Sequence, residues 1–290
     1  MWRDPVEWAL SIFPKIIDIM RKTALLILLL TAFVPMTLKA QCPLENTAFS
    51  SGEYLSYNLY FNWKFVWVKV GYASLSTVST KYKGQQAFRS SLITRGNGKL
   101  DKFFIMRDTL LGYVTPTLSP LYFRKGAEEG DRYYVDEVWY DYTGSKCKLK
   151  MHKQKHDKTH ENSEKTMDQC VYDMLNLFTR ARNFDPTGWK KGYTLKFPLA
   201  DGSGVLTGYL RYNGREKVKG DNGVSYNCMK LTYMEWSEKK NKFREFATFF
   251  VTDDKNHVPV RIDITLNFGN AKAFVTTMKG TRNPLTAITK

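Results

Sequence analysis

The fold is decided by the stretch Val258-Pro-Val260-Arg-Ile262-Asp-Ile264-Thr-Leu266-Asn-Phe268. An apolar side chain stands at every second position of this stretch. Since the side chains of a strand point alternately to the two faces of a sheet, the pattern predicts one buried face and one solvent-exposed face. The pattern is typical of an antiparallel strand with one solvated face.

Similar alternation dominates the chain from residue 53 onward, for example at Leu55, Tyr57, Leu59 and Phe61. Turn-forming pairs and triplets separate the runs. They are Lys83-Gly84, Asn97-Gly98, Asn213-Gly214, Asp221-Asn222-Gly223 and Asp253-Asp254-Lys255. We predict a mainly β protein of roughly ten strands, joined as sequential hairpins into an antiparallel meander that forms a half-barrel or barrel.

One segment in the middle of the chain follows a helical period instead. Apolar residues recur at helical spacing between Val171 and Ala181, and Asp168 is a suitable N-cap. Asn183 and Pro186 then favour termination. We predict one amphipathic helix near 169–183, which covers the open face of a curved sheet or plugs one end of its core. Two β lobes and one continuous sheet both fit this position, and we favour the single sheet.

The first 40 residues have the features of an export signal. Met20-Arg21-Lys22 is basic, Ala24 to Pro35 is apolar, and Ala40-Gln41 offers a cleavage point. The apolar run is shorter than the ~20 residues that span a bilayer. We therefore expect residues 20–40 to be a signal peptide, residues 1–19 to be an upstream start-site artefact, and residues 41–290 to form a single β-rich domain.

The chain is strongly basic, with a formal net charge of +16. The segment through residue 40 carries five basic and three acidic residues, so its removal leaves +14. Such a charge favours anionic partners, namely lipid phosphates or acidic glycans, although a solvated lysine-rich surface also fits. Export argues against nucleic acid. Charges at Asp136-Glu137 and Lys148-Leu-Lys150 interrupt any lipid-facing band, so we expect no membrane span after processing.

Four cysteines follow the signal: Cys42, Cys147, Cys170 and Cys228. In an oxidising compartment an even number suggests disulfides, and four cysteines allow three connectivities. Their spacings match no metal-binding pattern. Cys147 and Cys170 flank the most polar stretch of the chain, which favours that pair, and we expect at least one disulfide.

Several short motifs together resemble an exported bacterial family, the "domain of unknown function 3108" family. They are Phe49-Ser-Ser-Gly52-Glu53-Tyr-Leu55-Ser-Tyr57, Val70-Gly71-Tyr-Ala73, Arg107-Asp108, Leu118-Ser-Pro120-Leu-Tyr-Phe123, Tyr172-Asp173-Met174-Leu175 and Pro259-Val-Arg-Ile262. Asn176 stands where serine is frequent in the family. The resemblance implies a protein of the Gram-negative envelope, in the periplasm or outer envelope, with an antiparallel half-barrel and no assigned activity. It supplies no catalytic residues.

Catalytic motifs are missing from residues 41–290, including nucleophile elbows, phosphate-binding loops and zinc-binding helices. His152, His156 and His160 could bind zinc or copper from one helical face, but the surrounding residues are typical of a solvated hairpin tip. Since ligands need fixed geometry and supporting contacts, we predict no metal and no cofactor. Acidic residues cluster beside Arg124, Lys125 and Arg132, where charge balance explains them: Glu128, Glu129, Asp131, Asp136 and Glu137.

Aromatic residues give the remaining functional signal. Trp63, Phe65 and Trp67 are spaced to share one strand face, with Gly71 and Ala73 following on that face. Large residues followed by small ones on one face are typical of the narrowing interior of a curved sheet. An ordinary aromatic core would have the same residues. We predict a non-enzymatic envelope protein that binds or helps to assemble an anionic lipid or acidic polysaccharide. Trp63 and Trp67 would contact the apolar part, and three arginines would bind the head group: Arg107, Arg124 and Arg132. The alternatives are a glycan- or lipid-modifying hydrolase and a scaffold for a protein partner.

Overall fold

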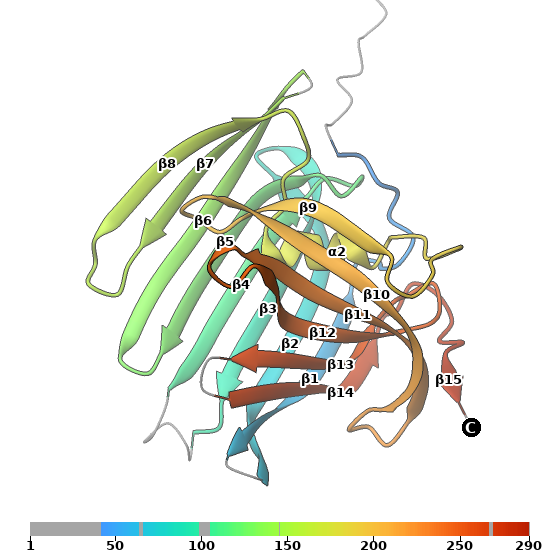
Figure 1. Cartoon of the computed structure of the whole chain (residues 1–290). Coiled ribbons are helices and arrows are strands. Elements are labelled where there is room, and N and C mark those ends of the chain that lie inside the picture. The colour runs from blue at the N-terminus through green and yellow to red at the C-terminus, as the bar shows by residue number, and fades with distance from the viewer. Residues whose placement is uncertain (1–41, 64–65, 99–104, 145, 267–268, 290) are drawn as a thin grey trace, which may run out of the picture. The chain divides into compact units, whose positions relative to one another are not determined.

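The alternating runs form one antiparallel sheet, shown from one side in Figure 1. The computed structural model describes residues 42–63, 66–98, 105–144, 146–266 and 269–289. The expected upstream segment 1–19 and signal peptide 20–40 therefore lie outside the described residues. The described residues all belong to one compact unit.

Fifteen strands occur within the described ranges, more than the roughly ten predicted. The first eight are β1 (Glu53–Trp63), β2 (Val66–Tyr82), β3 (Gln85–Gly96), β4 (Met106–Val114), β5 (Pro120–Glu129), β6 (Arg132–Thr143), β7 (Lys146–Gln154) and β8 (His160–Met167). The others are β9 (Thr194–Ala200), β10 (Val205–Lys219), β11 (Ser225–Ser237), β12 (Lys242–Thr252), β13 (Pro259–Leu266), β14 (Gly269–Lys279) and β15 (Ile288–Thr289).

The sheet is a meander, as predicted. Its order is β8-β7-β6-β5-β4-β3-β2-β1-β14-β13-β12-β11-β10-β9, and β15 pairs with β11. Each strand follows its neighbour in sequence except where β1 pairs with β14, which joins the two halves. The sheet is thus continuous and does not close, with β8 and β9 as its edges. The polar edge strand β8 has no buried position, so alternation could not reveal it.

The predicted helix is present but begins later than its spacing suggested. Helix α2 spans Met174–Ala181, and its N-cap is Asp173, whose carboxylate accepts from the backbone N–H groups of Leu175 and Asn176. The predicted cap Asp168 is exposed and pairs with a lysine. Residues just before the helix are held extended, because Cys170 is in a disulfide and the backbone N–H of Tyr172 bonds to β9. These tertiary contacts keep the residues before Met174 out of the helix.

The predicted turn at Asn213-Gly214 is wrong, since both residues lie inside β10. The pairing of β10 with β11 shifts register between Tyr212 and Arg215, and Gly214 has a φ of +98°. This is a β-bulge, in which a glycine adopts the left-handed conformation at little cost. It bends the long β10–β11 hairpin without ending the strand.

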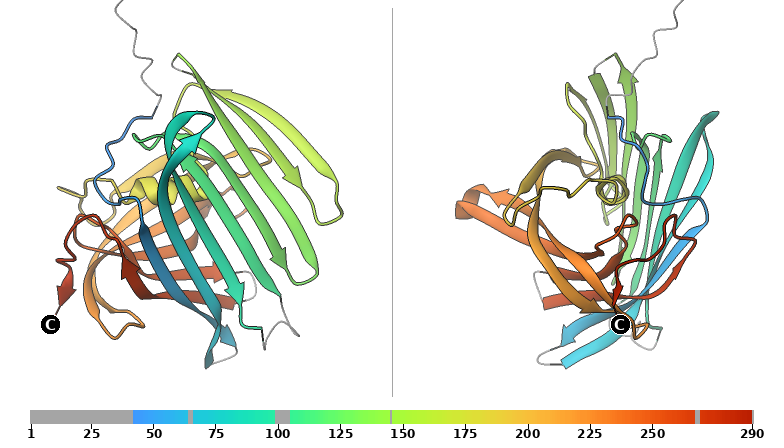
Figure 2. Two further views of the ribbon diagram at one scale, coloured as in Figure 1. Left: turned by 180° about the vertical axis from the view of Figure 1, so that it is seen from behind. Right: turned by 90° about the vertical axis from the view of Figure 1, so that its right-hand side faces the viewer.

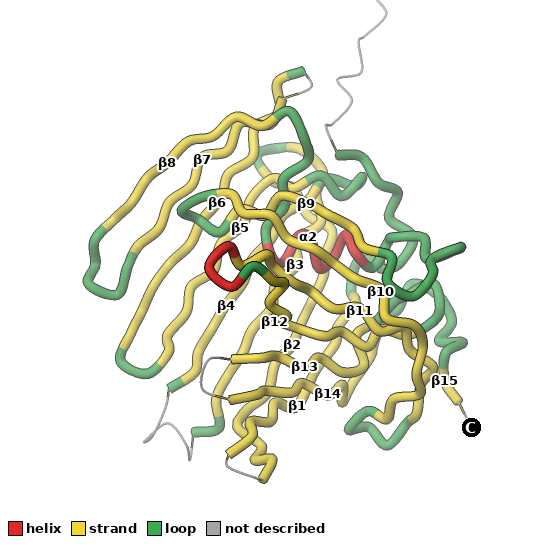
Figure 3. The backbone as a smooth tube through the Cα atoms, viewed as in Figure 1, coloured by secondary structure: helices red, strands yellow, loops and turns green. Residues whose placement is uncertain are grey.

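The sheet curls around α2, as the right-hand view of Figure 2 shows and as the helix and strand colours of Figure 3 make plain. The helix packs on β3, β4 and β5. On its other side, the ring of Phe178 lies 6.1 Å from that of Phe249 in β12. Tyr172, just before the helix, forms a parallel bridge with Leu199 in edge strand β9. The helix therefore contacts both halves of the meander.

The buried apolar residues form two main clusters, and each of them contains a residue of α2. One cluster contains Leu175 together with apolar residues of both halves of the sheet, such as Val138 and Val260. A second joins Leu177 to β9–β12. Because the helix presents apolar residues to both halves, it fills the space that the curled sheet leaves at its centre.

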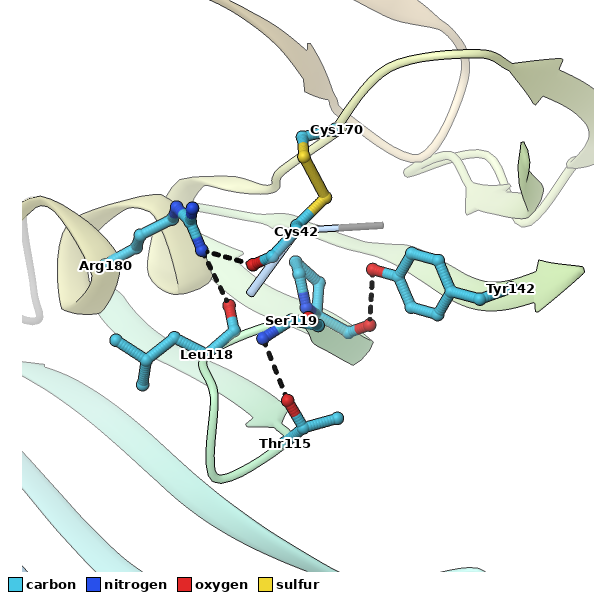
Figure 4. Close-up of a disulfide and its surroundings, with 8 residues drawn as sticks. Cys42, Thr115, Leu118, Ser119, Tyr142, Cys170 and Arg180 are labelled. Atoms are coloured by element: carbon cyan, nitrogen blue, oxygen red, sulfur yellow. Dashed lines mark hydrogen bonds between the residues drawn. A yellow bond between two sulfur atoms is a disulfide. The ribbon is translucent and has the colours of Figure 1, made fainter. Parts of the chain in front are cut away.

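The disulfide joins Cys42 to Cys170, with 5.5 Å between their Cα atoms, so the favoured pairing of Cys147 with Cys170 is wrong. Cys147 and Cys228 are free and fully buried. Figure 4 shows that Arg180 of α2 donates to the carbonyl oxygens of Cys42 and Leu118, at 2.7 and 3.5 Å. The expected presence of a disulfide is confirmed. Its connectivity depends on where the segment preceding β1 lies beside the helix, which cysteine spacing does not encode.

Candidate functional site

The two faces of the sheet have different surroundings. A Cβ atom on Gly112 of β4 would lie 2.5 Å from Asn176 Oδ1, so Gly112 faces α2. We call this side the helix face, and the other side the open face. Since successive residues of a strand alternate between faces, Tyr113 lies on the open face. Residues directly opposite each other on paired strands share a face, which assigns the neighbouring strands.

The three predicted arginines do not form one cluster. Arg107 and Arg124 both lie on the open face, since Tyr113 and its partner Tyr122 do. Each is next to a carboxylate: Arg107 Nη1 lies 3.4 Å from Glu128, and Arg124 Nε lies 3.8 Å from Glu137. Arg132 pairs in register with Glu129, which places it on the helix face. Strand parity therefore separates Arg132 from the other two arginines.

The predicted aromatic strand face is also wrong. Trp63 ends β1 and Trp67 lies in β2, so the residues do not follow one strand, and Phe65 lies outside the described residues. Trp67 is 39% exposed, and the ammonium group of Lys272 lies 4.3 Å from its ring centroid. Lys272 precedes the core residue Ala273, so Trp67 lies on the open face. A β-bulge between Trp67 and Ala73 reverses the parity that the sequence spacing implied.

The depression that the structure describes beside Trp67 is mostly polar. A depression of about 330 Å³ is lined there by Trp67, Asp263, Ile264, Thr265, Asn270, Ala271 and Lys272. Most of these residues are polar, whereas sites for the apolar part of a ligand are lined mainly by hydrophobic side chains.

A band of aromatic side chains crosses the open face elsewhere. The aromatic band consists of Tyr82, Tyr113, Tyr122 and Trp139, each half-buried. Ring centroids of neighbours are 4.9 Å apart for Tyr82 and Tyr113, 6.3 Å for Tyr113 and Tyr122, and 5.5 Å for Tyr122 and Trp139. The last two pairs are direct cross-strand neighbours. The band runs over β2, β4, β5 and β6, so no local sequence pattern could reveal it.

Cationic side chains surround the aromatic band. Arg89 lies directly opposite Tyr113, and Lys150 lies directly opposite Trp139. Lys83 Nζ is 5.5 Å from the ring centroid of Tyr82, and Arg124 is two residues from Tyr122. Acidic residues adjoin the band as well: Glu137 accepts a hydrogen bond from Tyr122 Oη at 2.5 Å, Glu164 lies 3.9 Å from Lys150 Nζ, and Asp141 is two residues from Trp139. The aromatic band is therefore bordered by cations, two of which, Arg124 and Lys150, lie next to carboxylates.

The helix face carries a separate row of charges. Lys125, Asp136, Lys153 and Glu161 lie opposite one another on β5–β8. Lys153 Nζ is 3.5 Å from Asp136 Oδ1. The alternating signs support the prediction that these acidic residues balance neighbouring cations. A hydrolase would draw its carboxylates from this row or from the nearby Asp108.

The carboxyl group of Asp108 also lies on the helix face, in surroundings that disfavour its ionisation. Its Oδ1 is buried and accepts no hydrogen bond from the described residues. Burial and the nearby Glu129 raise its pKa from 3.8 to about 6. Because the folded state disfavours the ionised carboxyl, the stability linked to this group is fully present below pH 3.8 and is lost as the pH rises through about 6.

We therefore expect Asp108→Asn to stabilise the protein increasingly with pH. The difference in unfolding free energy between variant and wild type should be larger at pH 7 than at pH 4, because asparagine cannot ionise. Urea denaturation at several pH values measures this difference. A difference that stays constant from pH 4 to pH 7 would contradict the assigned titration.

The described part of the chain contains no group of three or more histidine, cysteine or acidic side chains placed to hold a metal ion. No helix among the described residues is long and apolar enough to cross a membrane.

One solved structure supports the fold, and two others align less well. A β-barrel-like protein of domain of unknown function DUF1849 from Brucella abortus aligns with a TM-score of 0.50 at 9% identity, over 80% of this chain and 98% of that chain. A putative exported protein with a YmcC-like fold from Bacteroides fragilis aligns with a TM-score of 0.33 at 9% identity, over 82% and 100%. A putative lipoprotein from Parabacteroides distasonis gives 0.31 at 10%, over 82% and 99%.

The search of curated proteins returned no match. The family model for "Protein of unknown function (DUF3108)" matches residues 56–276, which include most of the sheet and all of α2. The motifs that suggested this family extend from β1 to β13. The chain belongs to the DUF3108 family.

Proposed function

We propose that this protein is an exported, non-enzymatic protein of the cell envelope that binds an acidic polysaccharide on its aromatic band. The observation that carries the proposal is the band itself, four half-buried rings side by side on the open face with cations along its borders. Export is supported by the basic and apolar segment of residues 20–40.

The chemistry of the band suits a charged sugar polymer. An aromatic ring buries an apolar surface at low conformational cost, and the apolar faces of sugar rings stack on it. Guanidinium groups bind carboxylates through two parallel hydrogen bonds, which Arg89 and Arg124 could supply beside the rings. The chain's net charge of +16 would raise the encounter rate with a polyanion.

A polysaccharide fits this surface better than a lipid does. The band is spread across several strands and is open to solvent, so it could follow an extended chain of sugar rings. An acyl chain needs an enclosed apolar site, and the depression beside Trp67 is mostly polar.

Cross-strand aromatic pairs also stabilise a sheet, by about 0.5–1.5 kcal/mol each. An experiment on the band must therefore distinguish a loss of ligand binding from a loss of protein stability. Trp236 is a useful control, because it is 39% exposed on β11 and its ring also packs on an aromatic neighbour, Phe243, at 5.1 Å.

We expect the purified protein to bind polygalacturonate at low salt and to bind the neutral polymer dextran at least tenfold more weakly. Trp139→Ala should reduce polygalacturonate affinity about tenfold or more, because it removes the widest ring, whereas Trp236→Ala should leave affinity unchanged. Isothermal titration calorimetry measures both, and circular dichroism checks that each variant is folded.

Three results would overturn the proposal. The first is no binding of polygalacturonate even at low salt, where charge screening is weakest. The second is an equal loss of affinity in Trp139→Ala and Trp236→Ala. The third is binding to phosphatidylglycerol vesicles that exceeds binding to polygalacturonate, which would favour an anionic lipid instead.

A further inference from the structure

The polar side chains at the β7–β8 edge bond to one another. His152 Nδ1 lies 2.9 Å from Glu137 Oε2, and His152 Nε2 lies 2.9 Å from His160 Nδ1. The predicted solvated hairpin tip is therefore correct only for His156, which lies in the turn between β7 and β8. The end of the β1–β2 hairpin differs from this edge, because it leaves apolar side chains exposed to solvent.

Three consecutive apolar residues are exposed at the start of β2. Val66, Trp67 and Val68 are 64%, 39% and 38% exposed, and the exposed Lys69 follows them. We call residues 66–69 the β1–β2 tip. Since alternate residues of a strand point to opposite faces, Trp67 lies on the open face and the two valines lie on the helix face. A strand that only builds a sheet buries one face, so an exposed run of three apolar residues is expected only where it serves a function.

The apolar surface continues from Val68 along the helix face of the sheet. Val68 and Ala271 both lie directly opposite Phe61 of β1. Ala271 in turn lies opposite Ile264 of β13, which is 36% exposed. The exposed apolar residues of the tip therefore extend to β13 and do not form an isolated pair.

The β1–β2 hairpin also extends beyond its neighbour β3. Within the described ranges β3 ends opposite Gly71, so residues 66–69 have no strand neighbour on that side. Figure 1 shows this hairpin at the lower end of the sheet. A protein that packs on a sheet covers one of its faces, whereas the headgroup region of a bilayer surrounds an inserted tip. Apolar side chains on both faces of the tip therefore favour a membrane surface as the partner.

The side chains around Trp67 are those that proteins place at the level of lipid headgroups. Tryptophan is enriched there because its ring is amphipathic. Lys272 Nζ lies 4.3 Å from the ring centroid of Trp67, and Lys69 is two residues further along β2. The sequence from residue 58 to residue 72 contains no acidic residue. The cations of this surface are therefore suited to anionic headgroups.

Two carboxylates of other strands and loops lie near this surface, and each is bonded within the protein. Asp263 pairs with Arg261 at 2.5 Å. Asp221 accepts a hydrogen bond at 2.7 Å from Tyr60, the residue opposite Lys69. The tip itself carries only apolar and cationic side chains.

We propose that the β1–β2 tip inserts into the headgroup region of a membrane that contains anionic lipid. Val66, Trp67 and Val68 supply the apolar contact, and Lys69 is attracted to the negative surface. The tip has less apolar surface than one acyl chain, so the contact is weak and reversible. Tyr82 of the aromatic band is the last residue of β2, whereas Val66 is the first. The membrane contact is therefore separate from the band and goes beyond the proposed polysaccharide binding.

The test uses a chain that begins at Gln41, the expected product of signal-peptide removal, and mixed vesicles of phosphatidylcholine and phosphatidylglycerol. Sedimentation should find half of the protein bound at about 1 mM lipid at low salt, because one acyl chain gives an association constant of only ~10⁴ M⁻¹. Val66→Ser combined with Trp67→Ser should lower the affinity at least tenfold. Lys69→Gln should lower it about fivefold, the contribution of one lysine near an anionic surface.

Trp236→Ser is the matched control, because Trp236 is also 39% exposed but lies on β11. It should bind the vesicles as the wild type does, and so should Trp139→Ala, which alters the aromatic band. Circular dichroism checks that each variant is folded. A loss of vesicle affinity confined to the tip variants supports the proposal.

Four results would overturn it. The first is no binding of the wild type to the mixed vesicles, which leaves the polygalacturonate test unaffected. The second is wild-type affinity in the double tip variant, and the third is equal binding to vesicles of pure phosphatidylcholine. The fourth is a loss of vesicle affinity in Trp139→Ala with none in the tip variants. That result would place the lipid on the aromatic band and would also count against a polysaccharide there.

Discussion

Replacing Arg182 by methionine should lower the free energy of unfolding by about 3–5 kcal/mol, the usual cost of breaking a buried ion pair. Arg182 follows α2 as its C-cap residue, and it binds Glu53 of β1 with a forked pair of hydrogen bonds of 2.5 and 2.8 Å. The two side chains are only 2% and 1% exposed. The variant would leave the Glu53 carboxylate buried without a countercharge, which is the origin of the large effect.

The pair also joins parts of the chain that are distant in sequence. Arg182 donates from Nε and Nη2 to the carbonyl oxygen of Asn256, at 3.1 and 3.0 Å, in the loop between β12 and β13. One side chain therefore connects the helix, the first strand and the late strands. Its loss should weaken the whole fold and not one hairpin.

A double variant separates charge from packing. Glu53→Leu combined with Arg182→Met removes both charges at similar volume, and we expect it to recover most of the loss. Urea denaturation of the single and double variants measures this. If the double variant is as unstable as Arg182→Met, then the hydrogen bonds to Asn256 dominate and the explanation from an unpaired charge is wrong.

Removing the disulfide should have the second large effect. We expect Cys42→Ala with Cys170→Ala to lower the free energy of unfolding by about 2–5 kcal/mol. The two cysteines are 128 residues apart, so the bond restricts a long loop in the unfolded chain. It also holds Cys42 where its carbonyl oxygen accepts from Arg180 of α2.

Reducing agent provides the control for this variant. The stability of the wild type should fall in dithiothreitol to that of the double variant, and the double variant should not respond. Thiol counting in denaturant should find two free thiols in the oxidised wild type, Cys147 and Cys228. A wild type whose stability is unaffected by full reduction would contradict the prediction.

The period-two pattern predicted the antiparallel meander because alternation is a local property of each strand. Val260, Ile262 and Ile264 alternate with charged residues, and they lie in β13 as expected. The helix was also foreseeable from its apolar spacing, although its first turn was not. Tyr172 is drawn into a bridge with Leu199, 27 positions further along, and no pattern near residue 170 encodes that contact.

The candidate sites were much less predictable. The tryptophan spacing was interpreted as one continuous strand, but a hairpin and a bulge separate Trp67 from both Trp63 and Ala73. A single inserted residue reverses the face of every later side chain, so errors in parity propagate along a strand. Ordinary alternation along β5 and β6 separates Arg132 from Arg107 and Arg124, without any bulge.

The sequence by itself determined an alternating, basic chain that must form an antiparallel sheet with one covering helix, and it predicts export. Those features follow from local spacing and composition. Only the tertiary structure decided that β1 pairs with β14, that Cys42 bonds to Cys170, and that His152 meets His160 beside Glu137. These contacts join residues from separate strands, and their geometry depends on register, bulges and sheet curvature, which arise only when the strands pack together.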